Sequence, residues 1–169
     1  MSTNYQSLPS WAYNSEAFFE LEKQHLFLGS WQLVCHLSNI PNNGDYFTFE
    51  LFNERVMAIR GHDGAVRAFH NVCAHRAARL LDGDSGNCGK RLTCPYHNWG
   101  YDLEGNLTNV PYRDQFVDFD ESQNGLVPVE MEIFQGFIFV RLKAADGPSV
   151  ADQFAPYLEE IKPYRFEEL

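Results

Sequence analysis

The sequence has no run of apolar residues long enough to cross a bilayer, which takes roughly 20 in succession. Its first residues, MSTNYQSLPSWAYN, contain neither a basic segment nor an apolar core, so we do not expect them to be a secretory signal. Basic residues are also scarce: 13 Lys and Arg stand against 23 Asp and Glu, giving a formal net charge of −10. Because such a surface repels phosphate, nucleic acid is not an expected partner. We therefore predict a cytoplasmic protein that binds neither membrane nor nucleic acid.

Cysteine is too sparse for a disulfide framework, with four among 169 residues. In a reducing cytoplasm, a few cysteines more often serve metal binding or reactivity than disulfides. The length suits one domain with terminal appendages. Aromatic residues are plentiful, with 14 Phe and 8 Tyr, and such side chains favour half-buried pleated surfaces. The composition therefore indicates a strand-rich globular domain.

Hydrophobic periodicity predicts a helix at residues 15–28, which Ser15 caps and Gly29 ends. From Trp31 the pattern changes to short runs with a period of two. Many short strands at close spacing predict a mainly β fold, an antiparallel β-sandwich or small barrel. The expected strands cover residues 31–37, 45–52, 55–61, 65–72, 90–94, 99–105 and 128–142, with turns at 53–54, 62–64, 104–106 and 135–136.

Pro148 and Ser149 start a short C-terminal helix, in which Asp152 stands three positions after Ser149 as a capping partner. Pro156 breaks or restarts that helix. We therefore divide the chain into an N-terminal helical lead-in (1–30), a β domain (31–145) and a helical tail (146–169).

Two cysteine–histidine motifs carry the chemistry. The first reads Cys73-Ala-His75-Arg and the second Cys94-Pro-Tyr-His97, with residues 76–93 between their histidine and cysteine. Each motif follows a predicted strand, so two loops can converge on one site. Thiolate and imidazole together bind zinc, and thiolates also suit iron–sulfur clusters. The residues alone leave both kinds of metal site open.

CxHR followed by CPYHNW resembles the Rieske motif of ring-hydroxylating and related Rieske non-haem iron oxygenases. The flanks HNVCAHR and NWGYDLEGNL, and the upstream stretch SEAFFELEKQHLFLGSWQLVCHLSNIPNNGDYF, also resemble their α subunits. The resemblance identifies residues 31–145 as a Rieske [2Fe–2S] domain that transfers one electron at a time. It implies that one iron is held by Cys73 and Cys94 and the other by His75 and His97.

The resemblance also implies a second layer around the cluster, because family members direct backbone N–H groups of both loops toward the bridging sulfides. Here these groups lie near Arg76, Tyr96 and Trp99. Two residues depart from the family pattern: Ala77 and Asn98 stand where glycine is common. Both are small or tolerate a left-handed backbone, so we expect them to tune the cluster without preventing its assembly.

The oxygenases also hold a mononuclear iron through two histidines and a carboxylate. No histidine follows His97, so residues 98–169 lack that pair. We therefore expect the chain to be a fragment of a terminal oxygenase component, with the mononuclear Fe(II) in an absent catalytic domain. The resemblance implies a reductase or ferredoxin as electron donor and a trimer-based homo-oligomer for the parent.

Two alternatives remain at this point. A free-standing Rieske ferredoxin would carry electrons without being an enzyme, and a zinc-stabilised interaction module would carry none. The other cysteines are expected to be structural, Cys35 as a packed thiol and Cys88 as a loop residue. Iron and acid-labile sulfide separate the cluster from zinc, and the sequence beyond Leu169 separates the oxygenase from the ferredoxin.

Overall fold

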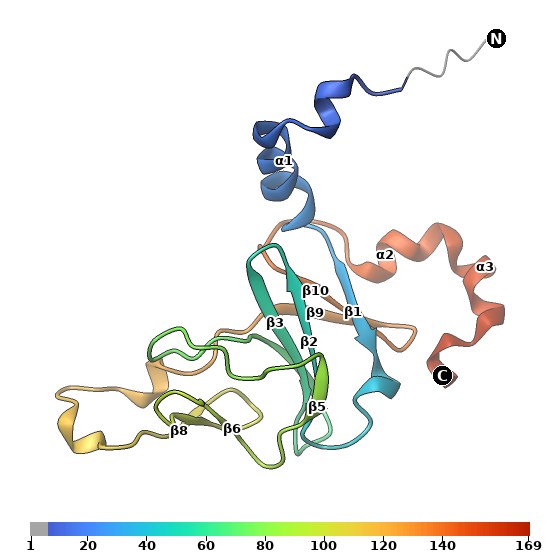
Figure 1. Ribbon diagram of the computed structural model, residues 1–169. Helices are drawn as coiled ribbons and strands as arrows, with labels where there is room; N and C mark the ends of the chain where they lie inside the picture. Colours follow the sequence, from blue (N-terminus) through green and yellow to red (C-terminus); the bar gives the residue numbers. More distant parts are fainter. Residues whose placement is uncertain (1–6) are drawn as a thin grey trace, which may run out of the picture.

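The computed structural model describes residues 7–169 and contains three antiparallel sheets with helical segments at both ends (Figure 1). The first six residues of the predicted lead-in and of the segment tested for a signal lie outside the described part. The first sheet has the order β1–β10–β9, from β1 (Gln32–His36), β10 (Phe137–Arg141) and β9 (Glu130–Phe134). The second has the order β4–β3–β2–β5, from β4 (Val66–His70), β3 (Glu54–Arg60), β2 (Asp45–Leu51) and β5 (Ser85–Asn87). The third has the order β6–β7–β8, from β6 (Leu92–Thr93), β7 (Gly100–Tyr101) and β8 (Leu107–Asn109).

The central strand β3 explains how the sheets pack together. Residues 56–59 are all fully buried, although neighbouring side chains of a strand point to opposite faces. Val56 and Ala58 join a core with β1 and β10, whereas Met57 and Ile59 join a second core with the third sheet. The continuous apolar run of β3 thus serves two hydrophobic cores. The predicted mainly β, sandwich-like fold is confirmed.

The turns lie close to their predicted places. The β9–β10 hairpin turns at Gln135 and Gly136, which both have positive φ values (50° and 80°), as the tight two-residue turn requires. The β2–β3 hairpin turns at Phe52 and Asn53, one residue before the predicted position, because Leu51 pairs with Glu54. Two short strands were not predicted: β5, which lies between the two cysteine–histidine motifs, and β8.

The helical ends carry the predicted caps. The Phe18 backbone N–H donates to Ser15 Oγ over 3.2 Å at the start of α1 (Glu16–Glu22), and a π-helical turn at Lys23–Phe27 extends this helix. In the tail, Ser149 and Asp152 cap each other reciprocally before α2 (Val150–Phe154). Pro156 restarts the chain as a 3₁₀ turn (Ala155–Tyr157), which leads to α3 (Leu158–Ile161).

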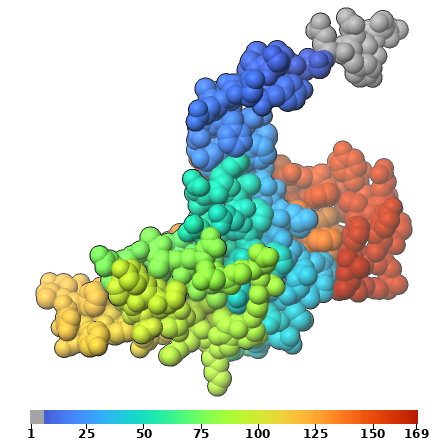
Figure 2. All heavy atoms as spheres, in the orientation of Figure 1, coloured from blue at the N-terminus to red at the C-terminus, as the bar shows by residue number. Residues whose placement is uncertain are grey.

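Two segments project from the body of the molecule (Figure 2). One is the N-terminal helical region, and the other, drawn in gold, is the loop that follows β8 and holds the 3₁₀ turns Arg113–Gln115 and Glu121–Gln123. The third sheet and this loop lie at the end of the molecule away from α1. Among residues 7–169, no helix is both long and apolar enough to span a membrane.

Candidate metal centre

The two motif-bearing loops have the same backbone architecture. In the first, the Cys73 N–H donates to the Ala78 carbonyl over 2.8 Å, and the Ala77 N–H donates to the Cys73 carbonyl over 2.9 Å. In the second, the Cys94 N–H donates to the carbonyl five residues later over 2.8 Å, and the N–H four residues later donates back over 3.0 Å. Each cysteine therefore opens an equivalent tight turn, one after β4 and one after β6.

Both turns need a left-handed backbone at the fourth residue after the cysteine. Ala77 has a φ of 56° and Asn98 a φ of 59°. These are the two positions where the sequence departs from glycine. Asparagine adopts this conformation readily, but for alanine it costs roughly 1–2 kcal/mol because Cβ crowds the carbonyl oxygen. The two departures therefore leave the loops intact, and one of them stores strain.

We expect Ala77→Gly to raise the free energy of unfolding by about 1 kcal/mol. Glycine removes most of the backbone strain of the native loop, and its larger conformational entropy in the unfolded state cancels only part of that gain. Urea denaturation of the metal-free chain measures the change. Asn98→Gly is the matched control, with an expected change of about 0.3 kcal/mol or less, since asparagine tolerates the conformation. Equal gains for both variants would contradict this assignment of the strain.

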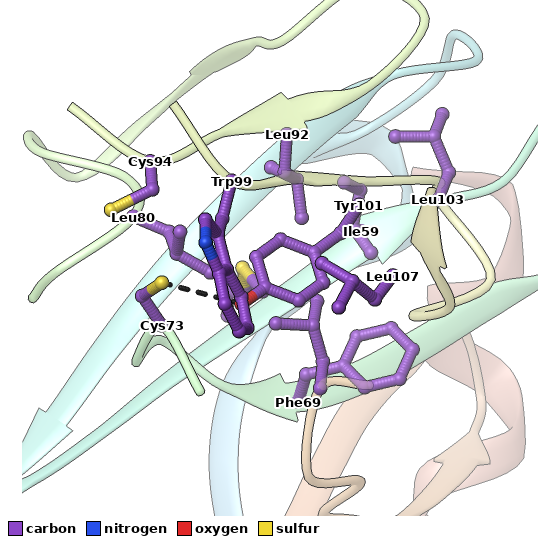
Figure 3. Close-up of a cluster of buried hydrophobic side chains, with 12 residues drawn as sticks. Ile59, Phe69, Cys73, Leu80, Leu92, Cys94, Trp99, Tyr101, Leu103 and Leu107 are labelled. Atoms are coloured by element: carbon purple, nitrogen blue, oxygen red, sulfur yellow. Dashed lines mark hydrogen bonds between the residues drawn. The ribbon is translucent and has the colours of Figure 1, made fainter. Parts of the chain in front are cut away.

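The two cysteine side chains are buried together in the core under the third sheet (Figure 3). Cys73 and Cys94 are each only 1% exposed and pack among Leu80, Trp99 and Tyr101. Burial raises the pKa of the Cys73 thiol, and the adjacent Cys94 thiol raises it further by hydrogen bonding and charge repulsion. A metal ion bound here would supply the positive charge that favours the thiolate form of a cysteine.

The two histidines also form a pair. The ring centroids of His75 and His97 are 4.7 Å apart, at an interplanar angle of 69°. The Nδ1 atom of each ring is buried and has no hydrogen-bond partner among the described residues. Because a buried nitrogen without a partner is costly, two such atoms on neighbouring rings indicate metal ligation through Nδ1.

Aromatic rings hold both imidazoles in place. The Trp99 indole, 3% exposed, stacks on His75 with centroids 4.6 Å apart and planes 10° apart. Tyr96, 62% exposed, lies against His97 at 3.8 Å between centroids. A hollow of about 290 Å³ adjoins both imidazoles, and the exposed Tyr112 of the projecting loop is part of its wall. The histidine side of the site is therefore open to the surface, whereas the cysteine side is closed.

The four motif residues thus sort into a pair of thiols and a pair of imidazoles. Within the part of the chain that the structure describes, no group of three or more His, Cys, Asp or Glu side chains is placed to hold a single metal ion. This arrangement suits two adjacent metal ions with two protein ligands each.

The structure places one further residue at the site that the sequence motifs did not single out. Tyr101 is fully buried, and its hydroxyl lies 3.2 Å from Cys73 Sγ while it accepts the Ala74 backbone N–H at 3.1 Å. Burial and the neighbouring Cys73 raise the pKa of Tyr101, so the phenol keeps its proton and is the hydrogen-bond donor when Cys73 is a thiolate. The sequence feature that could have pointed to Tyr101 is its position in a predicted strand directly after the second motif.

Three other residues named in the sequence analysis, Arg76, Cys35 and Cys88, have surroundings that are ordinary for their residue types. Arg76 is exposed. Its positive charge contributes to lowering the pKa of His75, after the larger effects of burial and of the His97 charge. Cys35 lies in the other hydrophobic core, where burial raises the pKa of its thiol to about 12. Cys88 is half-buried and donates to the Gly44 carbonyl over 3.3 Å. Neither of these cysteines belongs to the site.

Comparison with known proteins gives a consistent result. The family profile described as "Rieske [2Fe-2S] domain" matches residues 30–130. The carnitine monooxygenase oxygenase subunit of Escherichia coli K12 is 39% identical over 147 residues, which are 87% of this chain and 39% of that protein. The α subunit of biphenyl 2,3-dioxygenase from Rhodococcus jostii is 37% identical over 90% of this chain and 32% of its own length.

Solved structures agree with the sequence comparison. The apo form of the quaternary ammonium Rieske monooxygenase CntA superposes with a TM-score of 0.85 at 35% identity, covering 93% of this chain and 45% of that one. Naphthalene 1,2-dioxygenase from Rhodococcus sp. gives a TM-score of 0.80 at 28% identity, over 92% and 35% of the two chains. This chain thus spans less than half of the relatives that it matches.

Proposed function

Because the chain belongs to the Rieske [2Fe–2S] domain family, whose members bind such a cluster, we propose that Cys73 and Cys94 hold one iron and His75 and His97 the other. The observation that carries this ligand set is the sorting of the four side chains into a thiol pair and an imidazole pair with unpartnered Nδ1 atoms. When bound, the cluster supplies reversible one-electron transfer at a potential raised by its two neutral ligands.

The residues around the proposed cluster determine which of its sides is accessible to a partner protein. The cysteine side is sealed by the core, and the imidazole side adjoins the hollow beside Tyr112. Trp99 and Tyr96 fix the two rings against rotation. The backbone N–H groups near Arg76, Tyr96 and Trp99 complete the proposed second layer, with Tyr101 as a side-chain donor.

We further propose that the chain is the Rieske portion of a terminal oxygenase component. Relatives named as oxygenase subunits match 87–95% of the chain, including its helical lead-in, which favours this reading over a free-standing ferredoxin. The parent would hold a mononuclear iron in a further domain and take electrons from a reductase or ferredoxin. One relative's structure is described as giving insights into inter-subunit electron transfer, which supports an oligomeric parent. Our proposal for the parent is a trimer-based homo-oligomer.

We propose the same division of the chain as before: residues 1–30 form the lead-in, 31–145 the cluster domain and 146–169 a tail toward the catalytic part. We also propose that the protein is cytoplasmic, which agrees with its four free cysteines. The substrate is decided elsewhere in the parent. Relatives named for carnitine, glycine betaine and biphenyl are 39%, 37% and 37% identical to this chain, so similarity here does not separate quaternary amines from aromatic hydrocarbons.

Anaerobic purification of the chain tests the ligand set directly. We expect iron and acid-labile sulfide in equal amounts, and an EPR signal that appears only on one-electron reduction. Pulsed EPR should show coupling to two imidazole nitrogens, and replacing either His75 or His97 with cysteine should remove one of these couplings. Zinc alone, without iron or sulfide, would refute the proposal.

We expect Tyr101→Phe to lower the cluster's reduction potential by several tens of millivolts, since a tenfold change in a one-electron equilibrium corresponds to about 59 mV. The phenol donates to Cys73 Sγ, and a hydrogen bond to sulfur stabilises the more negative, reduced state. Protein-film voltammetry measures the shift. Tyr46→Phe is the control, because its hydroxyl bonds the distant Asp82 carbonyl and should leave the potential unchanged. An unchanged potential in Tyr101→Phe would show that the phenol does not tune the cluster.

A further inference from the structure

A groove that is separate from the imidazoles' hollow reaches the first cluster-binding loop. It consists of two adjoining hollows, of about 790 and 270 Å³, which share His70 and Val127 in their walls. The larger hollow extends to Glu130, Arg141 and Asp146. The smaller one is completed by Val72, Ala74 and Gly125.

The inner end of the groove lies on the backbone of the loop itself. Ala74 stands between Cys73 and His75, and its N–H donates to the Tyr101 hydroxyl that contacts Cys73 Sγ. A protein seated there therefore touches the backbone of the cluster loop at Ala74, next to both Cys73 and His75. The hollow beside His75 and His97 shares no wall residue with the groove. The domain thus offers two separate approaches to one cluster site.

The outer part of the groove is negatively charged. Glu130 and Asp146 line it, and Glu54 lies 3.6 Å from His70 at its middle. Glu130 and Arg141 pair through two hydrogen bonds and cancel each other's charge, so the negative charge of the groove comes from Asp146 and Glu54. The whole chain carries a formal charge of −10. The groove therefore complements a basic surface.

The middle of the groove is apolar. Val127 is 60% exposed although it follows the core residue Leu126, and Gly125 and Val72 flank it. An apolar centre with a charged rim is typical of small, transient protein interfaces, the class to which electron-transfer complexes belong. The exposed valine provides the contact, and the acidic rim provides steering.

We propose that this groove is the docking site of a basic segment of the electron-donor protein, which leaves the imidazole hollow free for the acceptor. This proposal rests on the proposed function, and it adds the surface from which the electron donor approaches the cluster. One electron leaves the reduced donor, and one ferric iron of the bound cluster becomes ferrous, so charge and electrons balance. Donor and acceptor can then be bound at the same time, because their surfaces do not overlap.

Stopped-flow mixing of the reduced, cluster-loaded chain with ferricytochrome c, a basic one-electron protein, tests the groove. One electron passes from the cluster to the ferric haem, and haem absorbance gives the second-order rate constant. We expect Val127→Arg to lower this rate constant about tenfold at low ionic strength, and Asp146→Lys about fivefold, with both effects lost at high salt. The charge-matched controls Leu21→Arg and Glu159→Lys, both at exposed helical positions outside the groove wall, should change it less than twofold.

Carbodiimide cross-linking of the same pair provides a second measurement that does not depend on the variants folding. Cross-links between cytochrome c lysines and Asp146 or Glu54 are expected. Equal effects of groove and control variants, cross-links confined to the tail, or a greater effect of Tyr112→Arg would overturn the groove proposal while leaving the cluster assignment intact. A dimer that Val127→Arg dissociates would assign the groove to a second copy and also overturn it. Failure to observe the reduced cluster's EPR signal before mixing would refute the proposed function and the groove together.

Discussion

Cys94→Ser is expected to yield a folded chain with almost no bound iron or sulfide. The thiolate supplies half of the sulfur ligation, and a serine hydroxyl stays protonated near neutral pH, so it cannot replace the soft anionic ligand. Cys94 is 1% exposed and lies beside Cys73, so no water or outside ligand has room to substitute for it. The measurements are iron and acid-labile sulfide per chain, with visible absorption and circular dichroism of the same sample.

Cys88→Ser is the matched control, because Cys88 is near in sequence but bonds the Gly44 carbonyl outside the site. It should keep the full cluster content. A Cys94→Ser chain that retains the wild-type visible spectrum, or a Cys88→Ser chain that loses it, would show that the four-residue ligand set is wrong.

Gly136→Ala is expected to lower the free energy of unfolding by about 3 kcal/mol or more, which is about 8 °C in melting temperature for a domain of this size. Gly136 has a φ of 80°, and a Cβ there would overlap the His36 imidazole. That ring cannot move aside easily: it is buried, packs edge-on against Phe137, and accepts the Ser38 backbone N–H at Nδ1. The cost therefore combines a left-handed alanine with displacement of a core side chain.

Gly83→Ala separates the two contributions. Gly83 has nearly the same φ, 82°, but an added Cβ would meet nothing within 4 Å. It should therefore lose only about 1 kcal/mol, the backbone part of the penalty. Chemical denaturation of the two metal-free variants side by side gives the comparison. Equal losses would mean that the contact with His36 contributes nothing.

Much of the site follows from local sequence. Each cysteine–histidine motif follows a predicted strand, so each was expected in a loop, and Cys73 and Cys94 do lie in two loops that follow β4 and β6. That the two loops meet depends on how their sheets pack, because β4 and β6 belong to different sheets. The caps at Ser15 and Ser149 and the turn at Gly136 were also predicted from local sequence, because they depend on hydrogen bonds or φ angles within a few residues.

The features that could not be predicted from the sequence depend on contacts between residues far apart in the chain. β5 has three exposed residues, including Gly86, and is a strand only because its backbone pairs with β2, about forty positions earlier. β8 is similarly short and pairs with β7. Tyr101 could not be assigned to the site from its own strand, since its contact with Cys73 spans 28 positions. Propensity does not report such pairing, which tertiary structure decides.

The matching turns at Cys73 and Cys94 have a consequence for how the centre is loaded. Each loop offers one sulfur and one nitrogen, so under the proposed ligand set every iron is clasped by both loops at once and neither loop can retain an iron alone. Loading is therefore all-or-none, and it favours insertion of a ready-made two-iron unit over stepwise capture of single ions. Iron and sulfide titrated together in equal amounts into the metal-free chain should accordingly populate only empty and fully loaded molecules, which native mass spectrometry can count.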